Sequence, residues 1–97
     1  SDFGVAVKRL SILQKKRGDV DQALRLWEEA AGRGHIYAFI ELAKHYEHKM
    51  RDAKTSIKWA RSARAEVEKA DLPAYVRKHW LGEIDHRLAR LERKAGL

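Results

Sequence analysis

Residues 36–69 read IYAFIELAKHYEHKMRDAKTSIKWARSARAEVEK, and this stretch decides the fold. Apolar side chains recur every three or four positions on both sides of a charged break near residues 49–52. Such spacing places the apolar side chains along one stripe of a helix. The stretch therefore predicts two amphipathic helices, over about 36–48 and 52–69, joined by a short turn that contains no glycine.

The same pattern continues upstream. It predicts helices over about 4–16 and 20–31, separated by Gly18 and Asp19. Glycine can close one helix and aspartate can cap the next, so a tight turn is expected between them. The run Gly32-Arg33-Gly34 ends the second of these helices.

A last helix is predicted downstream, over about 73–95. Pro73 suits a first helical position because its missing N–H needs no partner there, and Asp71 is expected to cap. The apolar stripe comprises Val76, Trp80, Leu81, Ile84, Leu88 and Leu91. The other side is expected to face solvent and carries Arg87, Arg90, Glu92, Arg93 and Lys94.

Length and composition fit one all-α domain over residues 1–97. The chain is 44% hydrophobic and 36% charged with one proline, as amphipathic helices require. It has no cysteine, which excludes disulfides and thiolate metal sites and makes the reducing cytoplasm the expected location. No apolar run is long enough for a membrane span, and a start at Ser1 without methionine suggests a cleaved tag or a fragment of a larger protein.

The two helix pairs repeat each other. Corresponding positions lie 32 to 33 residues apart, as in Leu10 and Leu42, Ala23 and Ser56, Leu24 and Ile57, and Ala30 and Ala63. A fixed period of this length is typical of helical repeat proteins.

Period and residue types together resemble the tetratricopeptide repeat. The second pair supplies Phe39, Leu42, Ala43, Tyr46, Ser56, Ile57, Ala60 and Ala63; the first supplies Val7, Leu10, Ser11, Gly18-Asp19, Ala23, Leu24, Trp27 and Ala30. Gln14 and Ala60 stand where aromatic residues are expected, so the repeats are degenerate. The resemblance implies an α-α superhelix of two repeats, about 4–31 and 36–69, with the helix over 73–95 as its cap.

In that family the first helix of each repeat lines a concave groove that takes peptides or helices. The resemblance thus implies partner-binding positions at Lys8, Gln14, Glu41 and Lys44. It implies a non-catalytic protein–protein interaction module whose partner is a protein or peptide, including a domain of the same parent chain. Two repeats also leave an open apolar face that two copies could share as a dimer.

A narrower resemblance concerns the run from Tyr37 to His48, continued by Arg51-Asp52, and the ending from His86 to Lys94. Both are similar to the helical tail of bacterial YprB-like proteins. In that family the tail follows a ribonuclease H-like exonuclease domain. The resemblance implies an accessory, nucleic-acid-binding tail without catalytic residues of its own.

The distribution of basic residues supports the alternative of a nucleic-acid-binding tail. Residues 49–97 carry 13 Lys or Arg against 7 Asp or Glu, so they hold +6 of the net charge of +7. Arg51, Lys54, Lys58 and Arg61 recur along one side of the helix predicted over 52–69. This stripe is either a solvated face or a surface for phosphates or an acidic partner. Arg87, Arg90 and Lys94 form a second stripe on the last helix.

No pattern indicates catalysis, a cofactor or a metal. His45 and His48 lie three residues apart, but no third ligand accompanies them at a known spacing. Carboxylate pairs such as Glu28-Glu29 fall on predicted helix surfaces, where solvated charge is their usual meaning. We therefore expect a binding protein.

Overall fold

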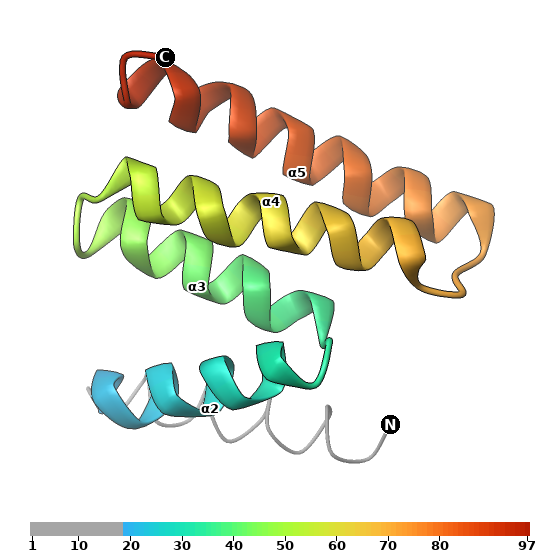
Figure 1. Cartoon of the computed structure of the whole chain (residues 1–97), viewed down its shortest axis with the longest axis horizontal. Helices are drawn as coiled ribbons and strands as arrows, with labels where there is room; N and C mark the ends of the chain where they lie inside the picture. Colours follow the sequence, from blue (N-terminus) through green and yellow to red (C-terminus); the bar gives the residue numbers. More distant parts are fainter. Residues whose placement is uncertain (1–18) are drawn as a thin grey trace.

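The computed structural model describes residues 19–97, and every regular element in that range is an α-helix (Figure 1). In chain order the helices are α2 (Val20–Gly32), α3 (Ile36–His48), α4 (Ala53–Lys69) and α5 (Ala74–Lys94). Each begins and ends within one residue of the predicted bounds, so the all-α class is confirmed. The helix expected over 4–16 lies outside the described residues.

Each of these helices packs against the next one along the chain. The main contacts are α2 with α3, α3 with α4, and α4 with α5. Figure 1 shows α4 between α3 and α5, while α2 lies beyond α3. Because the connections are short, neighbouring helices run antiparallel.

Small side chains allow α3 and α4 to approach closely, as the repeat pattern predicts. Ala43 on α3 and Ser56 and Ala60 on α4 have no exposed surface. The Ser56 hydroxyl donates a hydrogen bond to the Ala43 carbonyl, with Oγ···O 2.6 Å. Leu42 and Ile57 are buried around this contact. The core between the two helices is thus close-packed, and its buried hydroxyl has a partner.

The turn between α2 and α3 depends on glycine. Gly34 has a φ of 83°, a backbone conformation that residues with a side chain rarely adopt. Its amide donates to the Ala31 carbonyl at 2.9 Å, and the His35 amide donates to the Ala30 carbonyl at 3.1 Å. These paired bonds form a Schellman motif, which ends α2 at the predicted position.

The turn between α3 and α4 contains no glycine and uses a left-handed arginine instead. Arg51 takes a left-handed φ of 52°, which costs a non-glycine residue about 1–2 kcal/mol. Asp52 caps α4 and accepts hydrogen bonds from the Thr55 amide at 3.1 Å and the Thr55 hydroxyl at 2.6 Å. Arg51 therefore precedes α4, and the prediction that placed it along the helix face with the other stripe residues is wrong.

The join between α4 and α5 corrects a second prediction. Asp71 does not cap α5, because the capping position is Pro73, which offers no side-chain hydrogen bond. The end of α4 is instead capped by Arg77 of α5. Its guanidinium donates to three backbone carbonyls, those of Val67 at 2.6 Å, Ala70 at 2.9 Å and Glu68 at 3.1 Å.

One side of α5 is less exposed than predicted. Ile84 and Leu91 are buried as expected, but Arg87, assigned to the solvent side, is only 8% exposed. Arginine can be buried there because carboxylates of α3 and α5 lie beside its guanidinium. Among residues 19–97, neither α5 nor a shorter helix has a stretch long and apolar enough to cross a bilayer.

Arg77→Met should destabilise the fold by about 1–3 kcal/mol, because it leaves carbonyls at the end of α4 without donors. Urea unfolding measures this loss. The matched control is Lys78→Met, which removes the same charge from the next, exposed residue and should change stability by less than about 0.5 kcal/mol. Equal losses in both variants would contradict the capping role.

Candidate functional site

Two of the four residues predicted to line a groove lie together on α3. Glu41 and Lys44 form an ion pair, with Oε1···Nζ 3.3 Å. Both line a cavity of about 310 Å³ beside α2 and α3. The other described residues that line it are Val20, Ala23, Trp27, His45 and Lys49. Lys8 and Gln14 lie outside the described residues.

This cavity combines an apolar wall with a positively charged rim. Trp27 is 3% exposed and Ala23 is fully buried, so this wall is formed by residues of α2 that belong to the hydrophobic core. Lys44 is partly neutralised by Glu41, whereas Lys49 is exposed and forms no ion pair in the described part of the chain. The cavity can therefore accept an apolar side chain that has a carboxylate nearby.

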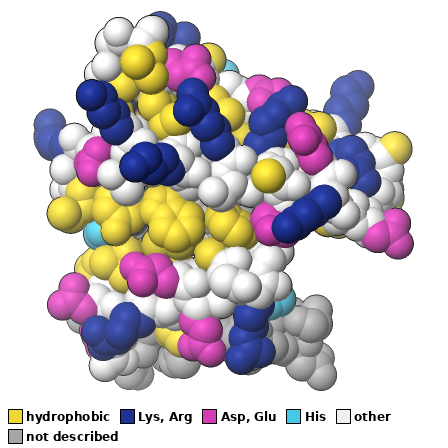
Figure 2. All heavy atoms as spheres, viewed as in Figure 1, with side chains coloured by type: hydrophobic (Ala, Val, Ile, Leu, Met, Phe, Trp, Pro, Cys, Tyr) yellow, Lys and Arg dark blue, Asp and Glu magenta, His cyan; other side chains and the backbone are white. Residues whose placement is uncertain are grey.

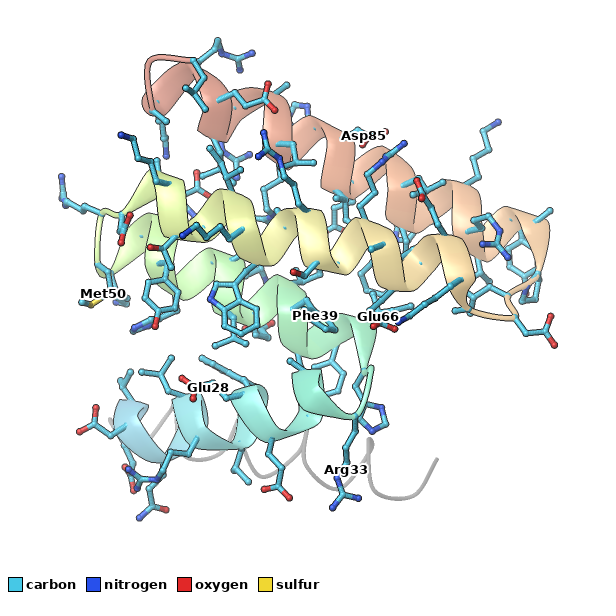
Figure 3. The ribbon with its side chains drawn as sticks, viewed as in Figure 1. Glu28, Arg33, Phe39, Met50, Glu66 and Asp85 are labelled. Carbon is cyan, nitrogen blue, oxygen red and sulfur yellow. The ribbon has the colours of Figure 1, made fainter. Side chains whose placement is uncertain are left out.

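A second apolar surface lies between α2 and α4. Figure 2 shows hydrophobic side chains gathered in the hollow between these helices. Phe39 lies there on α3 (Figure 3), and its ring centroid is 6.1 Å from that of Trp59 on α4. Trp59 is half-buried, so this aromatic pair is partly accessible to solvent.

The predicted basic stripe is only partly a helix face. Lys54, Lys58 and Arg61 are exposed on α4, and Arg51 is exposed in the turn before it. Arg61 lies 3.8 Å from the Glu92 carboxylate of α5. Arg51, Lys54 and Lys58 form no ion pair within residues 19–97, although Lys54 and Lys58 lie close enough to Asp52 to add to the lowering of its carboxyl pKa by the hydrogen bonds from Thr55. These three exposed cations are accessible to an anionic partner.

Charges beside the stripe hold α5 against α4. Arg64 donates a hydrogen bond to Asp85 of α5 (Figure 3) and lies 3.2 Å from Glu68 on its own helix. Figure 2 shows Lys and Arg side chains over both helices on this face. The positive charge of Arg64 is thus paired with carboxylates that hold α4 and α5 together, and it is less accessible to a ligand.

An ion cluster that no sequence pattern predicted joins α3 to α5. The Glu47 carboxylate accepts hydrogen bonds at 2.8 Å from both Nε and Nη2 of Arg90, at 2.7 Å from Lys94 Nζ and at 3.2 Å from Arg87 Nη1. The Glu47 side chain has no exposed surface. We call Glu47, Arg87, Arg90 and Lys94 the Glu47 cluster.

Hydrogen bonding keeps the Glu47 cluster ionised. The bond from Arg90 outweighs the opposing effect of burial and, together with the bond from Lys94, lowers the pKa of Glu47 from 4.5 to about 2. The same contact raises the pKa of Arg90. His48 Nε2 lies 3.4 Å from Glu47 Oε1, so a protonated His48 would add to the positive charge.

One sequence signal could have indicated this cluster. Ile40, Ala43 and Glu47 follow at i, i+3 and i+7, which places Glu47 on the buried face of α3. A carboxylate on a buried face needs cationic or hydrogen-bonding partners. Their identity could not be deduced, because Arg87 and Arg90 lie 40 and 43 residues further along the chain.

The histidines do not assemble a metal centre in the described part of the chain. Within residues 19–97, no group of three His, Cys, Asp or Glu side chains could hold a metal ion. The ring of His45 packs edge-on to that of Tyr46, with centroids 5.3 Å apart, and His48 lies beside Glu47. Packing and hydrogen bonding account for both residues.

No family model, curated protein or solved structure matches this chain. The two family resemblances therefore remain proposals, and the function is inferred from the surfaces described above.

Acid should remove the contribution of Glu47 to stability. Its pKa is about 2 in the folded state and 4.5 as the unperturbed value, so the folded state favours the ionised form. The contribution is complete above about pH 4.5 and is lost as the pH falls toward 2. A shift of this size corresponds to roughly 3 kcal/mol.

Glu47→Gln should lower stability at neutral pH by roughly 3 kcal/mol and flatten the pH dependence, because glutamine does not titrate. Urea unfolding at neutral and acidic pH measures both effects. Glu28→Gln is the matched control: Glu28 is exposed on α2, and this variant should keep the acid sensitivity of the unsubstituted chain. Identical pH dependence in the unsubstituted chain and both variants would disprove the contribution of Glu47 to stability.

Proposed function

We propose that this chain is a non-catalytic protein-interaction module built from two tetratricopeptide-like helix pairs, over about 4–31 and 36–69, and capped by α5. The packing of each described helix on its sequence neighbour supports the superhelix, because helical repeat proteins are built from such nearest-neighbour contacts. The 32 to 33 residue offset between the pairs supports the repeat assignment.

The cavity beside α2 and α3 carries this proposal. Glu41 and Lys44, the described groove positions, line it together with Trp27. Its volume of about 310 Å³ lies at the small end of the range for ligand pockets, large enough for one or two side chains of a peptide. The aromatic surface of Phe39 and Trp59 adds a region of the kind found at protein interfaces.

The lining favours a peptide with an apolar anchor next to an acidic residue. Among the described lining residues, the two lysines Lys44 and Lys49 outnumber the one carboxylate, that of Glu41, so this part of the rim carries a net positive charge. The apolar anchor would fill the space beside Trp27 and Ala23, which line this cavity. An acidic residue of the peptide would then pair with Lys49, which has no ion pair among residues 19–97.

A phage-displayed library of short random peptides tests this proposal. Selected peptides should carry an acidic residue close to a large apolar one, and Lys44→Glu with Lys49→Glu should weaken their binding by about tenfold or more. Lys58→Glu with Arg61→Glu changes the net charge equally, away from the cavity, and should leave binding within about threefold. Enriched peptides that bind all three proteins equally would refute the cavity as their site.

A nucleic-acid-binding accessory domain is the second candidate. It is favoured by one observation: Arg51, Lys54 and Lys58 are exposed and form no ion pair in the described range. Exposed cations can replace the counterions of a phosphate backbone. The resemblance to the tail of YprB-like proteins agrees with this function.

Titration of labelled single- and double-stranded DNA and RNA at about 50 and 200 mM salt tests the second candidate. Nucleic-acid binding should be tight at the lower salt, collapse at the higher, and weaken in Lys58→Glu with Arg61→Glu. In this assay Lys44→Glu with Lys49→Glu serves as the charge-matched control. No binding at either salt concentration would eliminate this candidate.

A further inference from the structure

The hollow between α2 and α4 is walled by these two helices and has α3 as its floor. The main helix contacts join α2 to α3 and α3 to α4, so α3 lies between the two walls. Figure 2 shows hydrophobic side chains along the hollow. Phe39 belongs to the floor and Trp59 to the α4 wall, and their ring centroids are 6.1 Å apart.

Helical register extends this apolar lining in both directions. Tyr46 follows Phe39 by two helical turns, so both lie on the same side of α3. Met50 lies at one end of the hollow (Figure 3). Leu24 precedes Glu28 by about one turn of α2, and Figure 3 shows Glu28 beside the hollow. We call the surface formed by Leu24, Phe39, Tyr46, Met50 and Trp59 the aromatic hollow.

The aromatic hollow keeps apolar surface within reach of solvent. Its floor at Phe39 is 7% exposed, and Met50 at its end is 59% exposed. The remaining members, Leu24, Tyr46 and Trp59, are half-buried and pack against the core. Contiguous exposed apolar surface marks interaction sites, and methionine adapts readily to different partners. The combination of a buried floor and accessible aromatic walls is typical of the anchor region of a protein interface.

Carboxylates stand beside the aromatic hollow on both walls. Glu28 on α2 is exposed and forms no ion pair among residues 19–97. Glu66 on α4 lies 2.9 Å from Lys69, which offsets its charge. The Glu66 side chain reaches across to the turn between α2 and α3, since a Cβ added at Gly34 would lie 3.2 Å from Glu66 Oε2. Glu28 is therefore the carboxylate with charge to offer a partner at this surface.

The nearest cations in the sequence point elsewhere. Arg25 follows Leu24, and Lys58 precedes Trp59, so each is one residue from a member of the aromatic hollow. One residue corresponds to a rotation of roughly 100° around an α-helix, which turns both cations away from the hollow. They reduce the negative potential of Glu28 less than a cation on the same side would.

The aromatic hollow favours a helical partner over an extended one. Every regular element in residues 19–97 is an α-helix, so this range offers no strand edge with which an extended peptide could pair. A helix satisfies its own backbone hydrogen bonds and presents side chains, as an apolar lining requires. Phe39 and Tyr46 lie roughly 10 Å apart along the axis of α3, which two turns of a partner helix would cover.

We propose that the aromatic hollow binds one amphipathic helix of a partner protein, whose apolar stripe packs on Phe39, Tyr46 and Trp59. A lysine or arginine beside that stripe would pair with Glu28. This mode of binding rests on the proposed protein-interaction function but uses a second surface. Its charge preference is the opposite, because the cavity beside Trp27 favours an acidic partner. No described residue of that cavity belongs to the aromatic hollow.

Selection from a phage-displayed library of helical peptides tests the proposal, with the whole chain as the target. The library randomises one face of a stable helical scaffold and thus differs from the short random peptides that test the cavity. Selected helices should carry apolar residues at i, i+4 and i+7 with a lysine or arginine beside them. A library without binders, or binders with acidic residues in place of the basic ones, would overturn the proposal.

Glu28→Lys is the decisive variant, because Glu28 is exposed and its replacement leaves the core unchanged. The affinity for selected helices should fall about tenfold or more. Glu68→Lys is the matched control: it makes the same change of charge at an exposed residue on the side of α4 opposite Trp59, and should stay within about twofold. An unchanged affinity in Glu28→Lys would remove the aromatic hollow as the site.

Met50→Ser tests the apolar contact at the end of the hollow. Met50 is 59% exposed, so the variant should fold, and the affinity for selected helices should fall about threefold or more. Lys44→Glu with Lys49→Glu alters only the rim of the cavity and should not weaken this binding. If acidic peptides bind at the cavity while no helix binds at the hollow, the proposed function stands and the aromatic hollow is eliminated.

Discussion

Ser56 of α4 donates its hydroxyl hydrogen to the Ala43 carbonyl of α3, with Oγ···O 2.6 Å. This bond exists only because small residues at the contact bring the two helix backbones close together. A larger side chain at Ala43 or Ala60, which have no exposed surface, would push α3 and α4 apart. Since α3 also carries α2 and α4 also carries α5, the placement of every other described helix depends on this contact.

The Glu47 cluster adds a link that helix packing does not provide. The main packing contacts join sequence neighbours, yet Glu47 of α3 binds three cations of α5. The link crosses the end of the domain beside the first residue of α4. Ion pairing therefore fixes one end of α5, and the Arg77 cap fixes the other end to the last turn of α4. Both anchors use arginine guanidinium groups that donate hydrogen bonds within the fold.

The positively charged side chains consequently fall into two groups, those that stabilise the fold and those that are exposed. Arg77, Arg87 and Arg90 serve the fold through buried or half-buried hydrogen bonds. Lys54 and Lys58, by contrast, are exposed and free of ion pairs within residues 19–97. Within residues 19–97, exposed cations of the second kind are more accessible to a ligand than the arginines that hold the helices together. Net charge alone cannot distinguish these groups.

The two cavities differ in the chemistry that they offer. The one beside α2 has Trp27 and Ala23 in its wall and suits an apolar group, while the described lining of the pocket where α3 meets α4 consists of Glu47, His48, Arg51, Ala53 and Lys94. They could be occupied independently, because no residue lines both.

The sequence by itself determined the local features. Apolar periodicity, glycine in the left-handed turn at Gly34 and small residues in the helix contact are set by residues a few positions apart, and the helix bounds followed from them. The resemblance to the tetratricopeptide repeat assigned Glu41 and Lys44 to a groove, and both line the cavity beside α2 and α3. Only the tertiary structure decided which charges meet: Glu47 with Arg90, Arg77 with the end of α4, and the left-handed Arg51 at a pocket wall. The reason is physical, since ion pairs and pockets depend on the distance between segments far apart in the chain, which helical periodicity does not encode.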